Sequence, residues 1–486
     1  MNAHTVTPVW AINRGILMWF LEKYADNVVV VSELGEKLTY GDLLISSEKL
    51  AAQISEKCLI FCLCRNCAGS LLGYVTFLNN GIVPLLLDAQ IDRQLLINLT
   101  ETYKPDYFWI HSDMESDFES YKAVYSDYNY TLMKTSYNYE YPLFKELALL
   151  LTTSGSTGSR KLVRQSYTNI KANMVAIAKY LEIDETERSI TTLPMNYTYG
   201  LSIINSHLYA GASLIMTEKT LVQKEFWQQF KAHGTTSFSG VPYTYEMLNK
   251  LRFIKMKLPA LRTMTQAGGK LLPELHKKFA EYARDTGKRF YVMYGQTEAT
   301  ARMSYLPYQK SVEKYGSMGI AIPGGKFTLI DVDEMEITEP EITGELVYEG
   351  PNVTLGYAEQ GQDLARGDER HGRLVTGDMA KMDGDGFYYI VGRKKRFLKI
   401  FGNRVNLDET EQLLKTRFNE VEVACGGVDD KMYIFITDGT LVQDLRQYII
   451  DKTGLNHIAF TVKHIKKISK NESGKTIYED LEQYFN

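Results

Sequence analysis

Short apolar runs alternate with longer amphipathic segments near the start of the chain. The pattern predicts strands at 28–32, 59–64 and 82–87, and helices at 40–54 and 69–78. Thr39 directly precedes the first of these helices and is a suitable N-cap. Because strands that alternate with helices are typical of a parallel sheet covered by helices, we expect an α/β N-terminal part.

The pattern changes further along the chain. Residues 113–141 are rich in Tyr, Asp and Ser and are expected to form a variable surface segment. A second α/β stretch covers 147–307 and includes a helix at 169–181. Short strands with Gly and Pro turns at 316–390 predict an antiparallel, barrel-like unit. Helices and strands then alternate again, with the clearest strand at 433–437.

A basic, glycine-containing junction at 392–404 separates the barrel-like unit from the last alternating stretch. We therefore predict a large N-terminal domain, 1–394, and a small α+β C-terminal domain, 395–486.

The composition is that of an ordinary globular protein. The chain has 486 residues, of which 44% are hydrophobic and 23% charged, and its formal net charge is −4. Without a basic excess, non-specific nucleic-acid binding is not expected. No apolar run reaches the ~18 residues of a membrane span, and the N-terminus lacks the pattern of a signal peptide. We expect a cytoplasmic protein.

Four of the five cysteines fall close together, at Cys58, Cys62, Cys64 and Cys67. A metal site is one interpretation, but the sequence offers no second cluster to complete the ligand set. The other interpretation is a buried strand in which cysteine serves as a small apolar residue. We favour the strand, with reduced thiols as in the cytosol.

The strongest chemical signal is a Gly/Ser/Thr loop after an apolar run at 149–151. Its glycines let backbone N–H groups turn toward an anion, its hydroxyls add donors, and Lys161 adds a positive charge. A Walker A loop is excluded, because Lys and Ser/Thr do not directly follow the second glycine. A flexible surface loop is the alternative. The loop consists of Thr153, Ser154, Gly155, Ser156, Thr157 and Gly158.

A second motif reads Tyr294-Gly295-Gln296-Thr297-Glu298. Tyr294 can stack on a base, Thr297 can bind a phosphate, and Glu298 is a hard oxygen ligand suited to Mg²⁺. Taken alone, the motif is equally compatible with a strand that ends in a polar turn.

Two weaker motifs follow. Asp378, in a Thr-Gly-Asp turn, can accept hydrogen bonds from both hydroxyls of a ribose, and Arg393 can add a donor. Lys475 lies on a glycine-containing loop near the end of the chain. Each of these residues alone is compatible with an ordinary turn or surface position.

Together and in this order, the four motifs resemble those of the adenylate-forming superfamily of acyl- and aryl-CoA ligases, peptide-synthetase adenylation domains and luciferases. The resemblance covers nearly the whole chain and includes the segment 193–200 and the turn Gly268-Gly269-Lys270. It implies an α/β fold in which two mainly parallel sheets and a distorted antiparallel barrel form the large domain. The small C-terminal domain would be mobile.

The resemblance also implies a role for each motif. The loop at 153–158 and Lys161 would hold the ATP phosphates, and Asp378 and Arg393 would bind the ribose. The remaining nucleotide contacts would come from Gly269, Lys270, Tyr294, Gly295, Gln296 and Thr297. Glu298 would bind Mg²⁺, and the catalytic residues would be Thr297, Glu298 and Lys475. Lys395 would be the hinge, and Lys399 and Gly402 would line the thiol tunnel.

The implied reaction is activation of a small carboxylic acid by ATP, followed by acyl transfer to a pantetheine thiol. The thiol acceptor would be CoA, or the phosphopantetheine of a carrier protein if the chain is a stand-alone adenylation enzyme. The alternative from another class is an inactive nucleotide-binding scaffold. The retention of Glu298, Asp378 and Lys475 favours an enzyme.

The acyl pocket is expected around Tyr197, Gly240, Val241 and Gly268. Members that activate amino acids use an Asp near the segment 194–200, where this chain has Asn196 and no Asp. Because an amide is a weaker partner for an ammonium than a carboxylate, we expect an acid without an α-amine.

Overall fold

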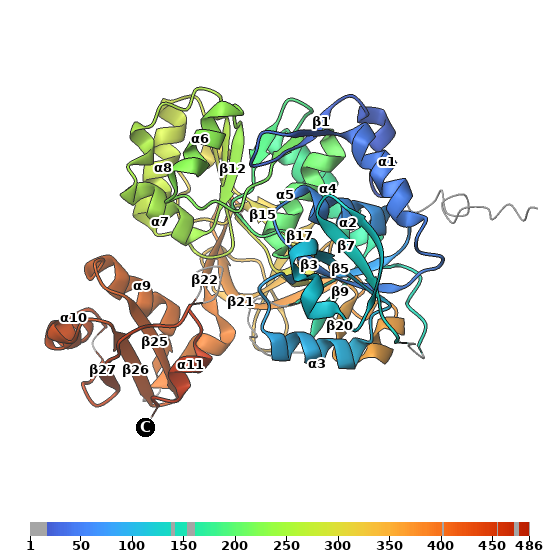
Figure 1. The fold of residues 1–486 in the computed structure, drawn as a ribbon. Helices are drawn as coiled ribbons and strands as arrows, with labels where there is room; N and C mark the ends of the chain where they lie inside the picture. The colour runs from blue at the N-terminus through green and yellow to red at the C-terminus, as the bar shows by residue number, and fades with distance from the viewer. Residues whose placement is uncertain are drawn as a thin grey trace, which may run out of the picture.

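The computed structural model describes residues 17–137, 141–152, 161–400, 403–453, 455–470 and 476–485. A large N-terminal part contains a mainly parallel nine-stranded sheet, a mixed eight-stranded sheet whose central strands are parallel and whose outer strands are antiparallel, and one antiparallel sheet. A small C-terminal domain lies beside it (Figure 1). The predicted α/β fold class with a small α+β domain is confirmed. The boundary between residues 394 and 395 stays a prediction.

The first sheet has eight strands in the order β20-β9-β8-β4-β3-β5-β7-β6. The strands are β3 (Leu59–Cys64), β4 (Val83–Asp88), β5 (Tyr107–His111), β6 (Lys122–Asp127), β7 (Tyr130–Lys134), β8 (Leu147–Thr152), β9 (Leu162–Ser166) and β20 (Gly356–Ala358). The helices of this first part of the chain are α1 (Tyr40–Ala51), α2 (Ala68–Asn79) and α3 (Arg93–Tyr103). Thr39 caps α1 in a reciprocal capping box with Asp42, as expected for this residue pair.

The segment 113–141 is not simply a variable surface segment. Its strand β7 is buried from Tyr130 to Met133 and pairs with β5. Tyr130 packs on Trp109 with ring centroids 5.5 Å apart and donates its hydroxyl to the carbonyl of Leu63 at 3.0 Å. The prediction went wrong because tyrosine can bury its ring once its hydroxyl has a partner.

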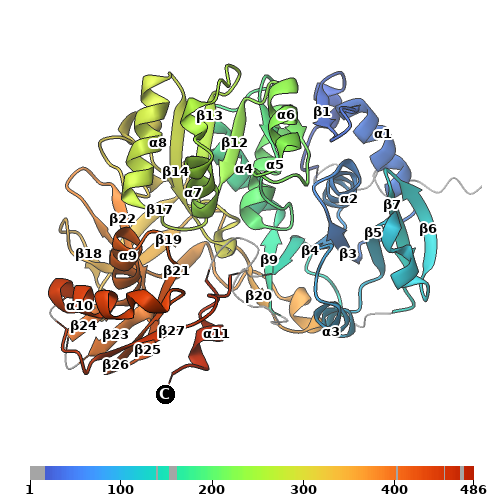
Figure 2. The same cartoon turned by 60° about the vertical axis from the view of Figure 1, so that its left-hand side comes forward.

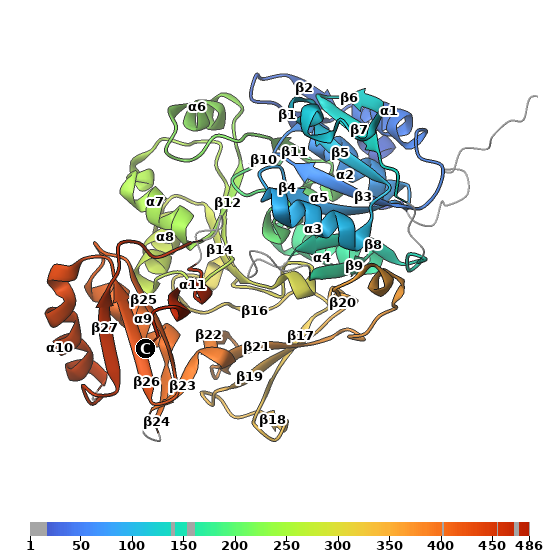
Figure 3. The same ribbon diagram turned by 60° about the horizontal axis from the view of Figure 1, so that its bottom comes forward.

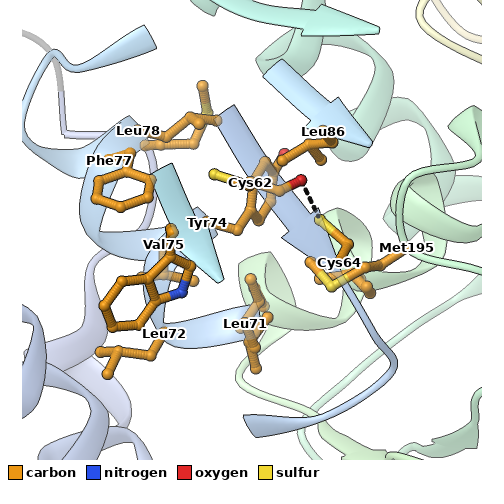
Figure 4. Packing of buried hydrophobic residues seen from close by; sticks show 14 of the residues in the cluster. Cys62, Cys64, Leu71, Leu72, Tyr74, Val75, Phe77, Leu78, Leu86 and Met195 are labelled. Atoms are coloured by element: carbon orange, nitrogen blue, oxygen red, sulfur yellow. Dashed lines mark hydrogen bonds between the residues drawn. The ribbon is translucent and has the colours of Figure 1, made fainter. Parts of the chain in front are cut away.

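The cysteine-rich strand β3 is buried along its whole length. Cys62 and Cys64 lie among Leu71, Tyr74 and Met195, and the thiol of Cys64 donates to the carbonyl of Cys62 at 3.4 Å (Figure 4). Burial raises the pKa of the Cys62 thiol. Since these thiols are packed as small apolar groups, the strand interpretation is confirmed.

The second sheet has nine strands in the order β16-β15-β14-β13-β12-β10-β11-β1-β2. The strands are β1 (Val28–Val31), β2 (Lys37–Thr39), β10 (Arg188–Ile190), β11 (Ser213–Ile215), β12 (Ser237–Gly240), β13 (Thr263–Gln266), β14 (Arg289–Tyr294), β15 (Ser304–Tyr305) and β16 (Ile320–Ala321). The helices of this part are α4 (Tyr167–Leu181), α5 (Thr198–Ala210), α6 (Lys224–Ala232), α7 (Pro242–Lys250) and α8 (Pro273–Asp285). Figure 2 shows α7 and α8 beside β12, β13 and β14.

Strands β12, β13 and β14 are parallel neighbours, so their carboxyl ends lie at one edge of the sheet. Residues predicted for the site follow each of these strands directly. Val241 follows β12, Ala267 follows β13, and the Gly-Gln-Thr-Glu part of the second motif follows β14. Ligands of open α/β sheets bind at this edge, which agrees with the predicted location of the site.

The predicted antiparallel unit is a five-stranded sheet in the order β18-β17-β19-β21-β22. Its strands are β17 (Lys326–Ile330), β18 (Glu336–Ile337), β19 (Gly344–Glu349), β21 (Arg373–Met382) and β22 (Tyr388–Arg393). A single bridge between Gly319 and Tyr388 ties this sheet to the segment leading into β16.

The C-terminal domain carries a two-stranded and a three-stranded sheet (Figure 3). Its elements are β23 (Phe397–Ile400), β24 (Asn403–Asn406), α9 (Leu407–Arg417), β25 (Val423–Val428), β26 (Lys431–Ile436), α10 (Val442–Thr453), β27 (Phe460–His464) and α11 (Glu479–Glu482). The predicted strand at 433–437 is β26. Among the described helices, none is both long enough and apolar enough to cross a bilayer.

Candidate active site

Asp378 is the centre of a hydrogen-bonded cluster that joins two sheets. One carboxylate oxygen, Oδ2, accepts from the Tyr294 hydroxyl at 2.5 Å and from the Gln296 amide at 2.8 Å. The Gln296 amide also donates to the carbonyl of Thr376 at 3.0 Å. The end of β14 is thereby fixed against β21, and the structure brings together three residues that the sequence motifs had singled out.

Arg393 completes this cluster from the neighbouring strand. It stands opposite Asp378 in the register of β21 and β22, and its Nε lies 3.6 Å from Oδ1 of Asp378. The guanidinium side chain is 67% exposed, whereas that of Asp378 is 8% exposed. An ion pair with so exposed a guanidinium contributes little stability, so Arg393 holds Oδ1 only weakly.

Burial governs the electrostatics of Asp378. Loss of solvation raises the pKa of its carboxyl, and the hydrogen bond from Tyr294 and the charge of Arg393 oppose that rise. A buried carboxylate with one oxygen fixed by neutral donors is a strong acceptor for a ligand hydroxyl at the other oxygen.

Glu298 is held by a residue that the sequence motifs did not include. The hydroxyl of Tyr357, on β20, donates to Oε1 of Glu298 at 2.8 Å. The backbone carbonyl of Glu298 accepts from Thr354 and from Arg370. The carboxylate is therefore oriented by the loop around β20, which lies in the other large sheet.

Two cationic side chains lie over the ring of Tyr357. Nζ of Lys161 lies 3.8 Å from the ring centroid, and the guanidinium carbon of Arg370 lies 4.6 Å from it. Burial, and then the charge of Glu298, raise the pKa of Tyr357 to about 12. The phenol thus stays neutral near pH 7 and connects Lys161, Arg370 and Glu298 in one polar group.

Arg164, on β9, fixes the position of Tyr357. Its guanidinium is fully buried and donates to the carbonyl of Tyr357 at 3.0 Å and to that of Leu355 at 3.3 Å. It also forms an ion pair with Glu369. A single buried arginine therefore orders the chain on both sides of Tyr357.

Sequence reasoning missed Tyr357, Arg370 and Arg164. Tyr357 lies 193 residues from Arg164 along the chain, and the antiparallel pairing of β20 with β9 brings the two together. Arg370 reaches the ring of Tyr357 from the segment that precedes β21. Arg164 follows only two apolar residues of β9, Leu162 and Val163, and precedes Gln165, so its burial has no distinctive local signal.

Three residues of the predicted acyl pocket lie in contact. Gly268 has φ +84°, and a Cβ there would lie 2.7 Å from the Tyr197 hydroxyl and 3.1 Å from Val241 Cγ1. Glycine is needed at this position for both reasons. At Gly240 a Cβ would approach Thr244 instead, at 2.6 Å. Burial raises the pKa of Tyr197, so its hydroxyl is neutral.

Other predicted nucleotide residues lie nearby. Lys270 donates to the carbonyl of Ile390 at 3.0 Å, and burial lowers its pKa. Gly269 accepts from the Gln266 amide at 2.9 Å. At Gly295 a Cβ would lie 1.6 Å from the carbonyl of Ala301, so only glycine fits this turn. Thr297 is buried next to Glu298.

The residues on either side of the predicted hinge, Lys395, form ion pairs with different domains. Lys394 pairs with Glu345 of the large domain at 2.6 Å, whereas Arg396 pairs with Asp408 and Glu411 of the small domain. Lys395, between them, is exposed. Lys399 is an exposed residue of β23, and its backbone N–H donates to Asp429 at 2.8 Å. Thr153 to Gly158, Gly402 and Lys475 lie outside the described residues.

The profile of a family described as AMP-binding enzyme matches residues 17–358. The chain is 29% identical to peroxisomal OPC-8:0-CoA ligase 1 of Arabidopsis thaliana over 349 residues, which cover 69% of this chain and 64% of that protein. It is 22% identical to 2-succinylbenzoate–CoA ligase of Bacillus subtilis (strain 168) over 494 residues, 98% of either chain. The match thus spans less than two thirds of the plant ligase but nearly all of the bacterial one.

Solved structures share the fold. O-succinylbenzoate CoA synthetase (MenE) from Bacillus subtilis, in complex with the acyl-adenylate intermediate OSB-AMP, aligns with a TM-score of 0.76 at 21% identity over 98% of both chains. ATP-bound MatB from Rhodopseudomonas palustris aligns with a TM-score of 0.76 at 19% identity, covering 96% of this chain and 99% of that one. With most of its length matched by the family profile, the chain belongs to the AMP-binding enzyme family.

Proposed function

We propose that the chain is an AMP-forming acid–thiol ligase, which activates a carboxylic acid with ATP and then transfers the acyl group to a pantetheine thiol. The observation that carries this proposal is the cluster of Tyr294, Gln296, Arg393 and Asp378, which presents a buried carboxylate oxygen beside an exposed guanidinium. This arrangement suits a ribose diol bound at the carboxyl edge of a parallel sheet.

The first step needs positioning and charge neutralisation more than covalent participation of the protein. The carboxylate oxygen of the acid attacks the α-phosphorus of ATP, and pyrophosphate leaves. Asp378 would hold the ribose, the face of Tyr294 would contact the adenine, and Thr297 would bind a phosphate oxygen. Lys161 and the loop 153–158 would hold the departing phosphates, and Lys475 would neutralise charge at the reacting centre.

The residues present fit a magnesium ion that is shared with ATP. Oε1 of Glu298 is fixed by Tyr357, which leaves its second oxygen for a metal. Within the described ranges, no three His, Cys, Asp or Glu side chains are placed to hold a metal. Mg²⁺ is commonly bound through one carboxylate together with substrate phosphates and water. When bound, it would supply charge neutralisation of the leaving pyrophosphate.

The second step would transfer the acyl group from the mixed anhydride to the thiol, with AMP as the leaving group. CoA is the acceptor that we propose first, because relatives such as OPC-8:0-CoA ligase 1 and 2-succinylbenzoate–CoA ligase are named as CoA ligases. A carrier-protein phosphopantetheine is the alternative. Lys399 and Gly402 would line the thiol path after the small domain rotates about Lys395.

The acid is proposed to lack an α-amine, because the segment 194–200 carries Asn196 and no Asp. We place the reaction in the cytosol, since all five cysteines are free thiols, three of them in one buried strand or directly before it.

ATP–pyrophosphate exchange with a panel of simple, aryl and α-amino acids tests the proposal. We expect exchange that depends on both an acid and Mg²⁺, with an acid lacking an α-amine as the best substrate. ATP binding without exchange for any acid would instead support the inactive scaffold. An α-amino acid that exceeds every other acid would overturn the assignment of the substrate.

A further inference from the structure

The loop between β14 and β15 contains Glu298 and turns back through two left-handed residues. Thr300 has φ +54° and Ala301 has φ +97°. Left-handed backbone is unfavourable for residues other than glycine, above all for a β-branched one, and it persists only where the surrounding structure holds it. The contacts of this turn with other parts of the molecule are therefore needed to keep its shape.

Asn352, in the loop before β20, makes these contacts. Its side chain is buried, and its Nδ2 donates to the carbonyl of Ala299 at 2.8 Å and to that of Arg302 at 3.0 Å. Its own backbone carbonyl accepts from the Thr300 hydroxyl at 2.7 Å. The Tyr348 hydroxyl donates to its Oδ1 at 2.8 Å, which fixes the amide with Nδ2 toward the turn. One buried asparagine thus bonds to both ends and to the middle of the turn.

Two asparagines of helix α4 support the same arrangement. Nδ2 of Asn169 donates to the carbonyls of Pro351 and Val353, on either side of the asparagine that holds the turn, at 2.8 and 2.7 Å. Nδ2 of Asn173 donates to the carbonyl of Arg302 at 2.8 Å. Because residues four apart lie on one face of a helix, α4 supports both the turn and the loop that holds it.

The loop before β20 also reaches Glu298 itself. Thr354 donates to the backbone carbonyl of Glu298 through both its N–H and its hydroxyl, at 3.0 Å each. The main chain of Glu298 is therefore held by Thr354, and the turn that follows it is held by Asn352. Without the bonds of Asn352 the left-handed turn would relax, and the Glu298 carboxylate would change its direction.

We propose that Asn352 is a positioning residue for the first step of the reaction: it holds the left-handed turn and thereby directs the Glu298 carboxylate toward Mg²⁺. This inference rests on the proposed function, because Asn352 acts only through the metal ligand and touches neither nucleotide nor acid. Removal of a group that orients a metal ligand typically lowers metal affinity by about tenfold to a hundredfold.

The test is a calorimetric titration of ATP into the full-length protein over a series of Mg²⁺ concentrations, with thermal scans of the same samples. In Asn352→Ala, the Mg²⁺ concentration that gives half of the maximal gain in ATP affinity should rise about tenfold. Thr300→Val removes only the hydroxyl bond to Asn352, so it should cause a smaller shift in the same direction. This milder variant decides the matter if Asn352→Ala does not fold.

Asn205→Ala is the matched control. Asn205 is 5% exposed, against 1% for Asn352, and it accepts from the Tyr74 hydroxyl at 2.9 Å. Both asparagines lose a buried bond to a tyrosine when replaced, so both variants should melt at a lower temperature than the wild type. The Mg²⁺ requirement should rise only in Asn352→Ala, because Asn205 and Tyr74 lie on α5 and α2, outside the loop of Glu298.

A rescue variant tests the role of the turn directly. Glycine adopts φ +97° without a steric penalty, so Ala301→Gly favours the left-handed turn even where the bonds that hold it are missing. Added to Asn352→Ala, it should lower the Mg²⁺ requirement again.

An unchanged Mg²⁺ requirement in Asn352→Ala and Thr300→Val, an equal rise in Asn205→Ala, or no rescue by Ala301→Gly would overturn the inference. ATP binding by the wild type that does not depend on Mg²⁺ would overturn it as well. Pyrophosphate exchange by the same samples separates the inference from the proposed function. The expected shifts in ATP binding without exchange for any acid would overturn the proposed function alone.

Discussion

The hydroxyl of Tyr294 donates to the carboxylate of Asp378 at 2.5 Å, across 84 residues of sequence. This bond ties the nine-stranded sheet to the antiparallel sheet at the point where both carry a predicted nucleotide residue. It also uses one oxygen of Asp378, so the ribose is expected to meet chiefly the other oxygen, the one nearer Arg393.

Replacing Asp378 with Asn should separate nucleotide affinity from stability. Burial raises the pKa of Asp378, so the stability that this group contributes is present at low pH and is lost as the pH rises through the raised value. At pH 7 the variant lacks this buried charge, so its melting temperature should equal or exceed that of the wild type. ATP affinity should fall about tenfold to a hundredfold, because a charge-assisted bond is lost.

Calorimetric titration with ATP and a thermal scan of the same samples measure both effects of Asp378→Asn. A variant with unchanged ATP affinity would show that Asp378 is only a turn residue.

Glu298→Gln should raise the Mg²⁺ concentration needed for half-maximal pyrophosphate exchange by about tenfold, because the metal loses an anionic ligand. Tyr357→Phe keeps the charge of Glu298 but removes the bond that orients it, so a smaller shift in the same direction is expected. Magnesium titrations of the exchange rate compare the two variants. If both titrate like the wild type, Glu298 does not hold the metal.

Arg164→Met should destabilise the protein by about 2–4 kcal/mol, because carbonyl groups of the loop around Tyr357 lose their buried donor. Arg373→Met is the matched control, since Arg373 and its partner Glu349 are 48% and 50% exposed. The control should stay within about 0.5 kcal/mol of the wild type. Denaturant unfolding measures both variants, and equal effects would mean that Arg164 has no special structural role.

Lys395→Pro should slow the second step more than the first. Proline fixes φ near −65° and limits rotation between the pairs Lys394–Glu345 and Arg396–Asp408. Lys395→Ala lacks this restriction and should behave like the wild type. Lys475→Ala should have the opposite effect: it should slow adenylation and leave transfer from supplied acyl-adenylate unchanged. Single-turnover assays of each step decide the matter; if Lys395→Pro slows both steps equally, Lys395 is not the pivot.

The sequence predicted those helices and strands whose hydrophobic pattern is clear within a few residues. It also pointed to motifs whose chemical groups are close together along the chain. Strand β3 has the predicted bounds. Asp378 lies beside Tyr294 and Arg393, and the nucleotide-binding roles of these residues stay predictions. The sequence did not predict the role of Tyr357, because that role depends on which strands become neighbours. A tyrosine after a glycine has no distinctive local signal.

The central claim is that the acid is activated as an acyl-adenylate, and the origin of one oxygen atom in AMP tests it most directly. The acid that best supports exchange is labelled with ¹⁸O in both carboxylate oxygens and allowed to react with ATP and CoA. Attack of the carboxylate on the α-phosphorus, followed by attack of the thiol on the carbonyl, leaves one labelled oxygen in the AMP. Mass spectrometry should therefore find AMP that carries one ¹⁸O. Unlabelled AMP, or ADP together with labelled phosphate, would contradict the account.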